Sequence, residues 1–140
     1  MKVLNPRTAF LSDYEVLRHL TETKSRYIAL GQSQGTTHAM KSSNLETIMK
    51  EVRDYLRTTP AATQSEEAIS NFMLEISPFA LEKAELLMMV NCRPSSIAEL
   101  DCIVEEMDQR FSEEESAEML RVVKRNLPPG PKEGEVIGSG

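Results

Sequence analysis

The chain has 140 residues, of which 40% are hydrophobic and 27% are charged, and its formal net charge is −6. This length suits one domain with a modest core, and the composition is that of a folded protein rather than a disordered one. The negative charge argues against broad binding to nucleic-acid phosphates, which requires clustered lysines and arginines. The longest apolar run, Leu86–Val90, is far too short to span a bilayer.

The first eleven residues, MKVLNPRTAFL, are predicted to form a short extended strand. Its apolar residues are Val3, Leu4, Phe10 and Leu11. Pro6 excludes a central-strand role for the middle of the segment, because proline has no N–H to donate. We find no second strand in the sequence, so this one would have to pair with another protein chain or leave its backbone groups in water. A frayed or helix-packed terminus is the alternative, and the sequence leaves the two readings even.

Two helices follow in the prediction. Each opens with a capping box, in which a serine and a glutamate three residues later satisfy free N–H groups. The first starts at the SDYE box of residues 12–15 and ends between residues 23 and 26. The second starts at the SNLE box of residues 43–46 and ends near residue 57. Between them, residues 25–43 are rich in Ser, Thr, Gly and Gln, which predicts a flexible connection.

Residues 79–127 read as three consecutive helices. Pro94 separates the first from the second, because its ring blocks a continuing helix. Capping boxes at residues 96–99 and 112–115 start the second and third helices. The apolar stripe of the second helix consists of Ile97, Leu100, Ile103, Val104 and Met107. Three short amphipathic helices cannot bury their stripes alone, so we expect them to pack on one another and on what precedes them.

A further helix, capped by Ser65 or Thr63, carries Ile69, Phe72, Met73 and Ile76. The predicted fold class is therefore mainly α. Residues 1–59 form an amino-terminal region made of the strand and the helical pair, and residues 60–127 form a helical bundle. Residues 128–140, rich in Pro and Gly, are predicted to be a disordered tail.

No catalytic, metal or cofactor site is predicted. Only His19 and His38 are available as bases, and nothing marks Cys92 or Cys102 as an activated nucleophile. These four residues do not have the spacing of a zinc site, and no Gly-rich loop precedes a helix to hold phosphate. Cys102 is interpreted as a small core residue, and both thiols are expected to be free in a reducing compartment. By elimination, the chain is interpreted as an interaction protein.

Acidic side chains are concentrated late in the chain. Residues 99–118 contain nine acidic residues and one base, Arg110. This block would repel a nucleic-acid backbone. It could meet a basic protein surface, and the alternative is an ordinary solvated helix face.

Several stretches of the chain resemble a known family. The opening MKVLNPRTAFLSDYEV, the later LRTTP, and the run LEKAELLMMVNCRPSSIAELDCIVEEMDQRFSEEE are similar to the smaller stalk subunit of nuclear RNA polymerase III. This family is also called the calcitonin-gene-related-peptide receptor component. The most telling pieces are Ala84–Leu87, Asn91–Pro94 and Val104–Glu106, and the resemblance covers Met1–Leu127.

The resemblance implies a non-catalytic nuclear subunit with no cofactor. In that family the amino-terminal region pairs with the larger stalk subunit, which carries an oligonucleotide-binding barrel, and the heterodimer joins the polymerase core and takes part in initiation. The carboxy-terminal helices resemble the helicase-and-RNase-D carboxy-terminal (HRDC) domain. Carried over to this chain, the partner-facing residues would be Val3, Leu4, Phe10, Leu11, Tyr14 and Leu17, with Leu45 and Ile48 behind them.

The acidic block departs from what a nucleic-acid-binding bundle requires. RNA contact is therefore assigned to the partner's barrel, and Glu105, Glu106 and Asp108 become a possible docking face for an initiation factor. Other readings are the small stalk subunit of another RNA polymerase, an adaptor that couples a membrane receptor to its effectors, and a nucleic-acid-binding module acting alone. No lipidation motif or basic membrane patch favours the adaptor, and an enzyme is the least favoured class.

Overall fold

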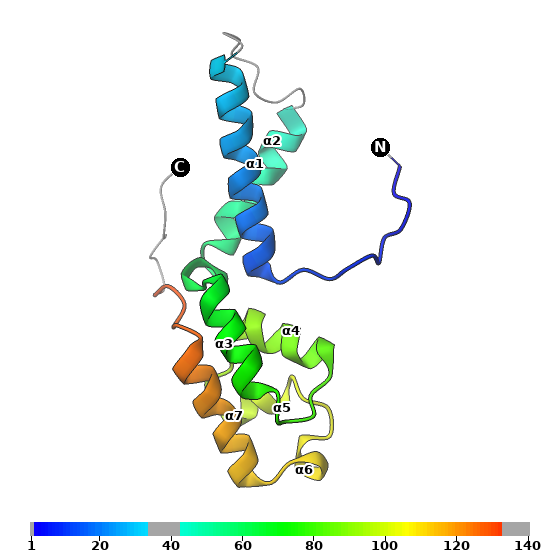
Figure 1. The fold of residues 1–140 in the computed structure, drawn as a ribbon, viewed down its shortest axis with the longest axis vertical. Coiled ribbons are helices and arrows are strands. Elements are labelled where there is room, and N and C mark those ends of the chain that lie inside the picture. The colour runs from blue at the N-terminus through cyan, green and yellow to red at the C-terminus, as the bar shows by residue number, and fades with distance from the viewer. Residues whose placement is uncertain (1, 34–42, 133–140) are drawn as a thin grey trace.

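The computed structural model describes residues 2–33 and 43–132 (Figure 1). These residues form seven α-helices and one 3-10 helix, and they contain no β-strand. The elements are α1 (Asp13–Ser33), α2 (Ser43–Leu56), the 3-10 helix η1 (Pro60–Thr63), α3 (Glu66–Ile76), α4 (Lys83–Cys92), α5 (Ile97–Asp101), α6 (Met107–Arg110) and α7 (Glu113–Asn126). The predicted mainly α fold class is confirmed.

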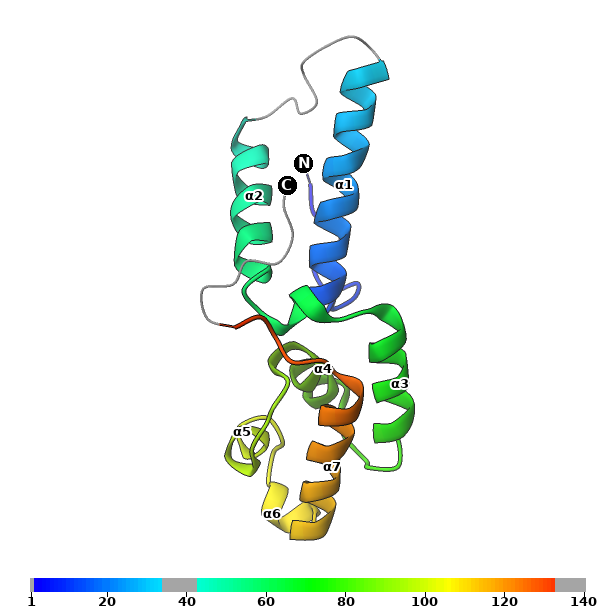
Figure 2. The ribbon, with the colours of Figure 1, turned by 90° about the vertical axis from the view of Figure 1, so that its left-hand side faces the viewer.

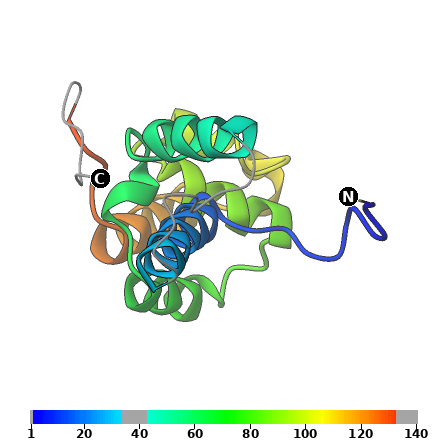
Figure 3. The same ribbon diagram turned by 90° about the horizontal axis from the view of Figure 1, so that it is seen from above.

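The helices form two groups along the length of the molecule. Helices α1 and α2 pack side by side and run in opposite directions at one end, and α3 to α7 form a bundle at the other end (Figures 1 and 2). The 3-10 helix η1 lies between the groups and contacts α1, α2 and α4. The segment before α1 projects away from the helices, both from the side and from above (Figures 1 and 3).

The hydrophobic core belongs to the bundle. Its buried residues are Phe72, Ile76, Met89, Val90, Leu100, Val104, Met107, Met119, Val122, Val123 and Leu127. They come from α3 to α7 and their connections, so the bundle helices bury most of their stripes against one another as expected. Met73 and Ile97 of the predicted stripes are exceptions, because both side chains are exposed. The helical pair buries Met49 and Leu56 of α2, which lie outside this cluster. The likeness to the HRDC domain stays a prediction.

The predicted capping boxes at the starts of α1 and α7 are formed. At α1, the Ser12 amide donates to Glu15 Oε2 at 2.7 Å and the Glu15 amide donates to Ser12 Oγ at 3.2 Å. Ser112 and Glu115 make the same two bonds at 2.7 Å and 3.1 Å. At α5 only half of the predicted box forms, because the Glu99 carboxylate accepts from the amide of Ser95.

Helix α1 is longer than predicted. It continues to Ser33, so residues 25–33 are helical and do not belong to a flexible connection. No proline interrupts this stretch, and α1 is supported by packing against α2, so the helix continues through the glycine and polar residues near its end. Residues 34–42, the remainder of the predicted connection apart from Ser43, lie outside the described residues.

The helix predicted from Ser96 through Met107 is two helices. Helix α5 ends at Asp101, and α6 begins at Met107 after Glu106, whose φ of 49° is left-handed. A non-glycine residue with this φ is strained and needs support from its surroundings. The support comes from Glu105, the residue before it, whose amide donates to Glu85 Oε1 at 3.1 Å and whose carbonyl accepts from Arg110 Nη1 at 2.8 Å.

Glu85 and Arg110 form a bidentate ion pair beneath this turn. Arg110 Nη1 donates to Glu85 Oε1 at 2.6 Å, and Nη2 donates to Oε2 at 3.1 Å. Glu85 is only 7% exposed, and its carboxylate also accepts from the Glu82 amide at 2.8 Å. The Arg110 guanidinium lies 5.2 Å from the centre of the Phe111 ring, which meets Phe79 edge to face. The pair therefore ties the start of α4 to the connection between α5 and α7.

The NCRP segment at the end of α4 joins the two groups of helices. Asn91 Oδ1 accepts from the Asp13 amide at 2.9 Å, which satisfies one of the free N–H groups at the start of α1. Arg93 ends α4 in a left-handed conformation, and its Nε donates to the Leu127 carbonyl at 2.8 Å. Nearby, the buried Gln64 donates from Nε2 to the Val90 carbonyl at 2.6 Å.

The first part of the predicted tail packs on the protein. The Pro129 carbonyl accepts from Thr63 Oγ1 at 2.9 Å, and Gly130 lies against Pro60. Residues 128–132 have no regular secondary structure, and residues 133–140 lie outside the described residues. The structured part of the chain therefore extends beyond the predicted boundary at residue 127.

Replacing Glu85 with glutamine is expected to destabilise the protein in a pH-dependent way. Hydrogen bonds from Arg110 lower the pKa of Glu85 from 4.5 to about 2. The folded state then binds fewer protons than the unfolded state, so this contribution is complete above pH 4.5 and is lost as the pH falls towards 2. We expect Glu85→Gln to lower the free energy of unfolding by about 3 kcal/mol at neutral pH.

Urea unfolding of both proteins over this pH range measures the effect. The matched control is Glu114→Gln, which changes an exposed carboxylate in the first turn of α7. The difference between wild type and Glu85→Gln should shrink as the pH falls. A difference that stays constant with pH would show that the carboxylate charge does not stabilise the fold.

Replacing Asn91 with alanine is expected to loosen the join between α4 and α1. The variant loses the acceptor for the Asp13 amide, which should reduce the free energy of unfolding by about 1 kcal/mol and speed hydrogen exchange at Asp13. Asn126→Ala is the control, because it removes only a local bond to the Val122 carbonyl at the end of α7. Unchanged exchange at Asp13 in Asn91→Ala would rule out this role.

Candidate partner-binding surface

The segment before α1, residues 2–12, exposes most of its apolar side chains. Val3 is 66% exposed, Leu4 88%, Phe10 76% and Leu11 54%. Before Ser12, the hydrogen bonds of the segment are two contacts with Asn5: Oδ1 accepts from the Arg7 amide at 3.0 Å and the carbonyl accepts from Thr8 Oγ1 at 3.3 Å. The segment forms no strand in this chain. Because a strand needs a neighbour to complete its hydrogen bonds, the predicted strand stays a prediction.

The other predicted partner-facing residues lie in two different places. Tyr14 and Leu17 are half-buried in the first turns of α1, close to the bundle. Leu45 and Ile48 are 44% and 57% exposed near the start of α2, which is the end of the helical pair far from the bundle (Figure 1). The structure therefore does not gather all of the predicted residues into one patch.

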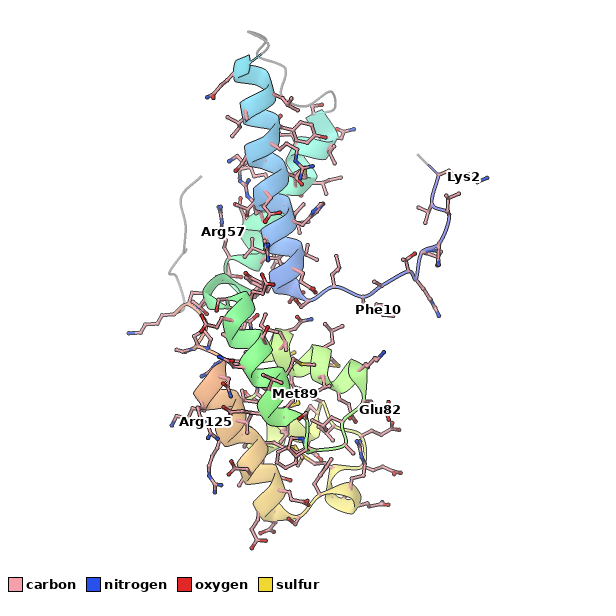
Figure 4. The ribbon with its side chains drawn as sticks, in the orientation of Figure 1. Lys2, Phe10, Arg57, Glu82, Met89 and Arg125 are labelled. Carbon is pink, nitrogen blue, oxygen red and sulfur yellow. The ribbon has the colours of Figure 1, made fainter. Side chains whose placement is uncertain are left out.

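An open groove lies where residues 7–15, α3 and α4 meet. Its walls include Phe10 and Tyr14 on one side, Met73 of α3, and Leu87 and Met88 of α4. We call residues 2–12 the arm. Figure 4 shows Phe10 on the arm above α4, the helix that begins after Glu82 and contains the buried Met89. The α3 and α4 residues of the groove cannot be singled out from the sequence, because an apolar stripe gives no sign of which members remain uncovered.

The three acidic residues predicted to dock a factor are exposed on one turn. Glu105 and Glu106 belong to the turn before α6, and Asp108 lies in the first turn of α6. The backbone of Glu105 is held on both sides, by the Glu85 carboxylate and by the Arg110 guanidinium. The acidic side chains are therefore presented from a backbone that has little freedom to move.

The described histidine and cysteine residues, His19, Cys92 and Cys102, belong to three different parts of the fold: α1, α4 and the end of α5. His19 is exposed on α1, and His38 lies outside the described residues. Cys92 and Cys102 are both free and exposed, so the interpretation of Cys102 as a core residue is wrong. Cys102 keeps a helical backbone, and it is two residues from the buried Leu100 and from the buried Val104, on the other side of the turn. The described part of the chain contains no group of three or more metal-binding side chains. It also contains no helix long and apolar enough to cross a membrane.

Exposed apolar side chains on an arm, on α2 and around a groove are typical of a protein that binds other proteins. Comparison with known proteins identifies the family. The family model for RNA polymerase Rpb4 matches residues 10–127. The chain therefore belongs to the RNA polymerase Rpb4 family, which confirms the resemblance found in the sequence.

Two relatives are similar over nearly their whole length. The protein named DNA-directed RNA polymerase III subunit rpc9 in Schizosaccharomyces pombe is 33% identical over 129 residues, which cover 91% of this chain and 100% of the relative. The protein named DNA-directed RNA polymerase III subunit RPC9 in Saccharomyces cerevisiae is 31% identical over 157 aligned residues, covering 88% of this chain and 98% of the relative.

Proposed function

We propose that this chain is a non-catalytic nuclear subunit of DNA-directed RNA polymerase III. It forms the stalk heterodimer with the larger, barrel-containing stalk subunit, and it supports initiation. The observation that carries this proposal is the projecting arm, whose apolar side chains are exposed in a chain that matches polymerase III subunits over 91% and 88% of its length. Both relatives bear names of polymerase III subunits, which favours this enzyme over other RNA polymerases.

The arm is suited to strand addition. Val3 and Leu4 are adjacent and Pro6 follows closely, so only a short edge strand can form before the chain turns at Asn5. Pairing with a sheet edge of the larger subunit would satisfy the backbone and cover the apolar side chains. Complete burial of one such side chain stabilises a complex by about 2 kcal/mol.

The charge of the chain supports assigning RNA contact to the partner. At a net charge of −6, and with exposed acids at Glu105, Glu106 and Asp108, the bundle would repel phosphate rather than attract it. The partner's barrel is of a fold that binds oligonucleotides. The alternative role, an adaptor for a membrane receptor, rests on the second name of the family and predicts enrichment with membranes instead of co-purification with nuclear polymerase.

Removal of residues 2–11 is expected to weaken the heterodimer. The change leaves Ser12 in place to cap α1, so the helices should fold as before. After co-expression with the larger stalk subunit, size-exclusion chromatography with light scattering should give a one-to-one complex for the full chain. We expect the dissociation constant of the truncated chain to rise at least about ten-fold, which corresponds to about 1.4 kcal/mol.

Val3→Asp and Leu4→Asp test the same contact without shortening the chain, and Lys2→Asp is the control because it changes charge but removes no apolar side chain. Equal affinity of the full and truncated chains would locate the interface elsewhere. If the full-length chain does not bind the larger subunit, the proposed function is overturned, and the receptor adaptor becomes the favoured alternative.

The acidic turn is proposed as a docking face for an initiation factor with a basic surface. Its support is the rigid backbone at Glu105 and the exposure of the three carboxylates. Reversal of Glu105, Glu106 and Asp108 to lysine should reduce recruitment of initiation factors to the assembled polymerase at least about ten-fold and leave the heterodimer intact. Glu67→Lys, an exposed acid on α3, is the control. Unchanged recruitment would make the acidic turn an ordinary solvated surface.

A further inference from the structure

The groove between the arm, α3 and α4 has uncovered apolar walls. Met73 is 40% exposed and Met88 is 45% exposed, while Phe10, on the opposite side, is 76% exposed. Methionine is unbranched and flexible, and it is common on surfaces that adapt to a partner. Apolar side chains from three separate elements thus border one hollow, which distinguishes this site from the scattered exposed residues of any protein surface.

The charged residues at the groove are not balanced. Arg18 and Glu66 pair with each other at 2.7 Å, and the Glu15 carboxylate accepts from the Ser12 amide. Within the described part of the chain, the two remaining charged side chains, Arg7 and Lys83, form no ion pair. Both are positive, in a chain whose net charge is −6. The groove therefore combines apolar walls with two cations outside any ion pair, and its charged lining, with the Glu15 carboxylate included, has a small positive excess.

The same groove is continuous with the arm. Residues 7–10 form part of its lining, and residues 2–6 extend from them away from the helices (Figures 1 and 3). A protein chain that pairs with the outer part of the arm would therefore lie beside the groove entrance. Two isolated cations are too few to hold a nucleic-acid backbone, which needs a run of basic contacts.

We propose that this groove binds a segment of the larger stalk subunit that carries apolar side chains flanked by carboxylates. The inference rests on the proposed heterodimer and extends its interface from the arm onto α3 and α4 of the bundle. The apolar side chains of the segment pack on Met73, Met88 and Phe10, and its carboxylates pair with Arg7 and Lys83. The bundle is then a second contact that fixes its orientation on the partner, in addition to the arm.

The test compares groove variants with matched variants outside the groove. Met73→Glu and Met88→Glu place a negative charge on the walls, and Lys83→Glu reverses one of the cations. Leu74→Glu is the control for the first two, because Leu74 is on α3, is 73% exposed and does not line the groove. Lys124→Glu, an exposed lysine of α7, is the control for Lys83→Glu. All altered side chains are exposed, so the unfolding midpoints should stay close to that of wild type.

Each full-length variant is titrated with the purified larger stalk subunit. We expect the three groove variants to raise the dissociation constant at least about ten-fold and the two controls to change it less than about two-fold. The effect of Lys83→Glu should shrink at high salt. Hydrogen exchange of the wild-type complex should also show new protection over residues 66–76 and 83–92.

The outcomes separate this inference from the function on which it rests. If Val3→Asp and Leu4→Asp weaken binding while the groove variants and their controls behave alike, the heterodimer stands and the groove contact is overturned. If wild type does not bind the larger subunit at all, the proposed function fails and the groove contact fails with it. If the groove variants weaken binding to the larger subunit, their controls do not, and the wild-type complex shows protection over α3 and α4, the groove contact is supported.

Discussion

The ion pair between Glu85 and Arg110 is the interaction on which the bundle most depends. One carboxylate, almost completely buried, accepts from the Arg110 guanidinium and from the amides of Glu82 and Glu105. It thereby starts α4, supports the left-handed turn before α6, and places Phe111 against Phe79. A buried carboxylate needs such a full set of donors, since desolvation would otherwise exceed the Coulombic gain. The same pair gives the exposed acidic turn its fixed backbone.

The join between the helical pair and the bundle has a different character. It consists of a few polar contacts and the packing of η1 between the groups. The Asp13 amide donates to the Asn91 side chain, the Arg18 guanidinium donates to Glu66, and the Gln64 side chain donates to the Val90 carbonyl. The hydrophobic cluster does not extend across this join. The arm joins the start of α1 beside this junction of the two helical groups. The residues that orient the two groups therefore also determine the direction in which the arm and the groove are presented to a partner.

Much of the local structure was predictable because it depends on neighbouring residues. The cap at Ser12, the break at Pro94 and the start of α7 each rest on contacts within about four residues, and each is found. The family was also predictable, because the order of short motifs along the chain does not need coordinates. The split between α5 and α6 was not, since a continuous apolar stripe gives no sign that Glu105 bonds to Glu85, twenty residues earlier.

By itself, the sequence determined the helical class, most helix starts and the family, because periodicity, capping and motif order are properties of short segments. Only the tertiary structure decided the length of α1, the division of α5 from α6, and which apolar residues stay uncovered. The groove is of this second kind: Phe10, Met73 and Met88 meet only after three distant segments fold together. An apolar stripe shows that a helix has a face to bury, and packing alone determines how much of that face remains for a partner.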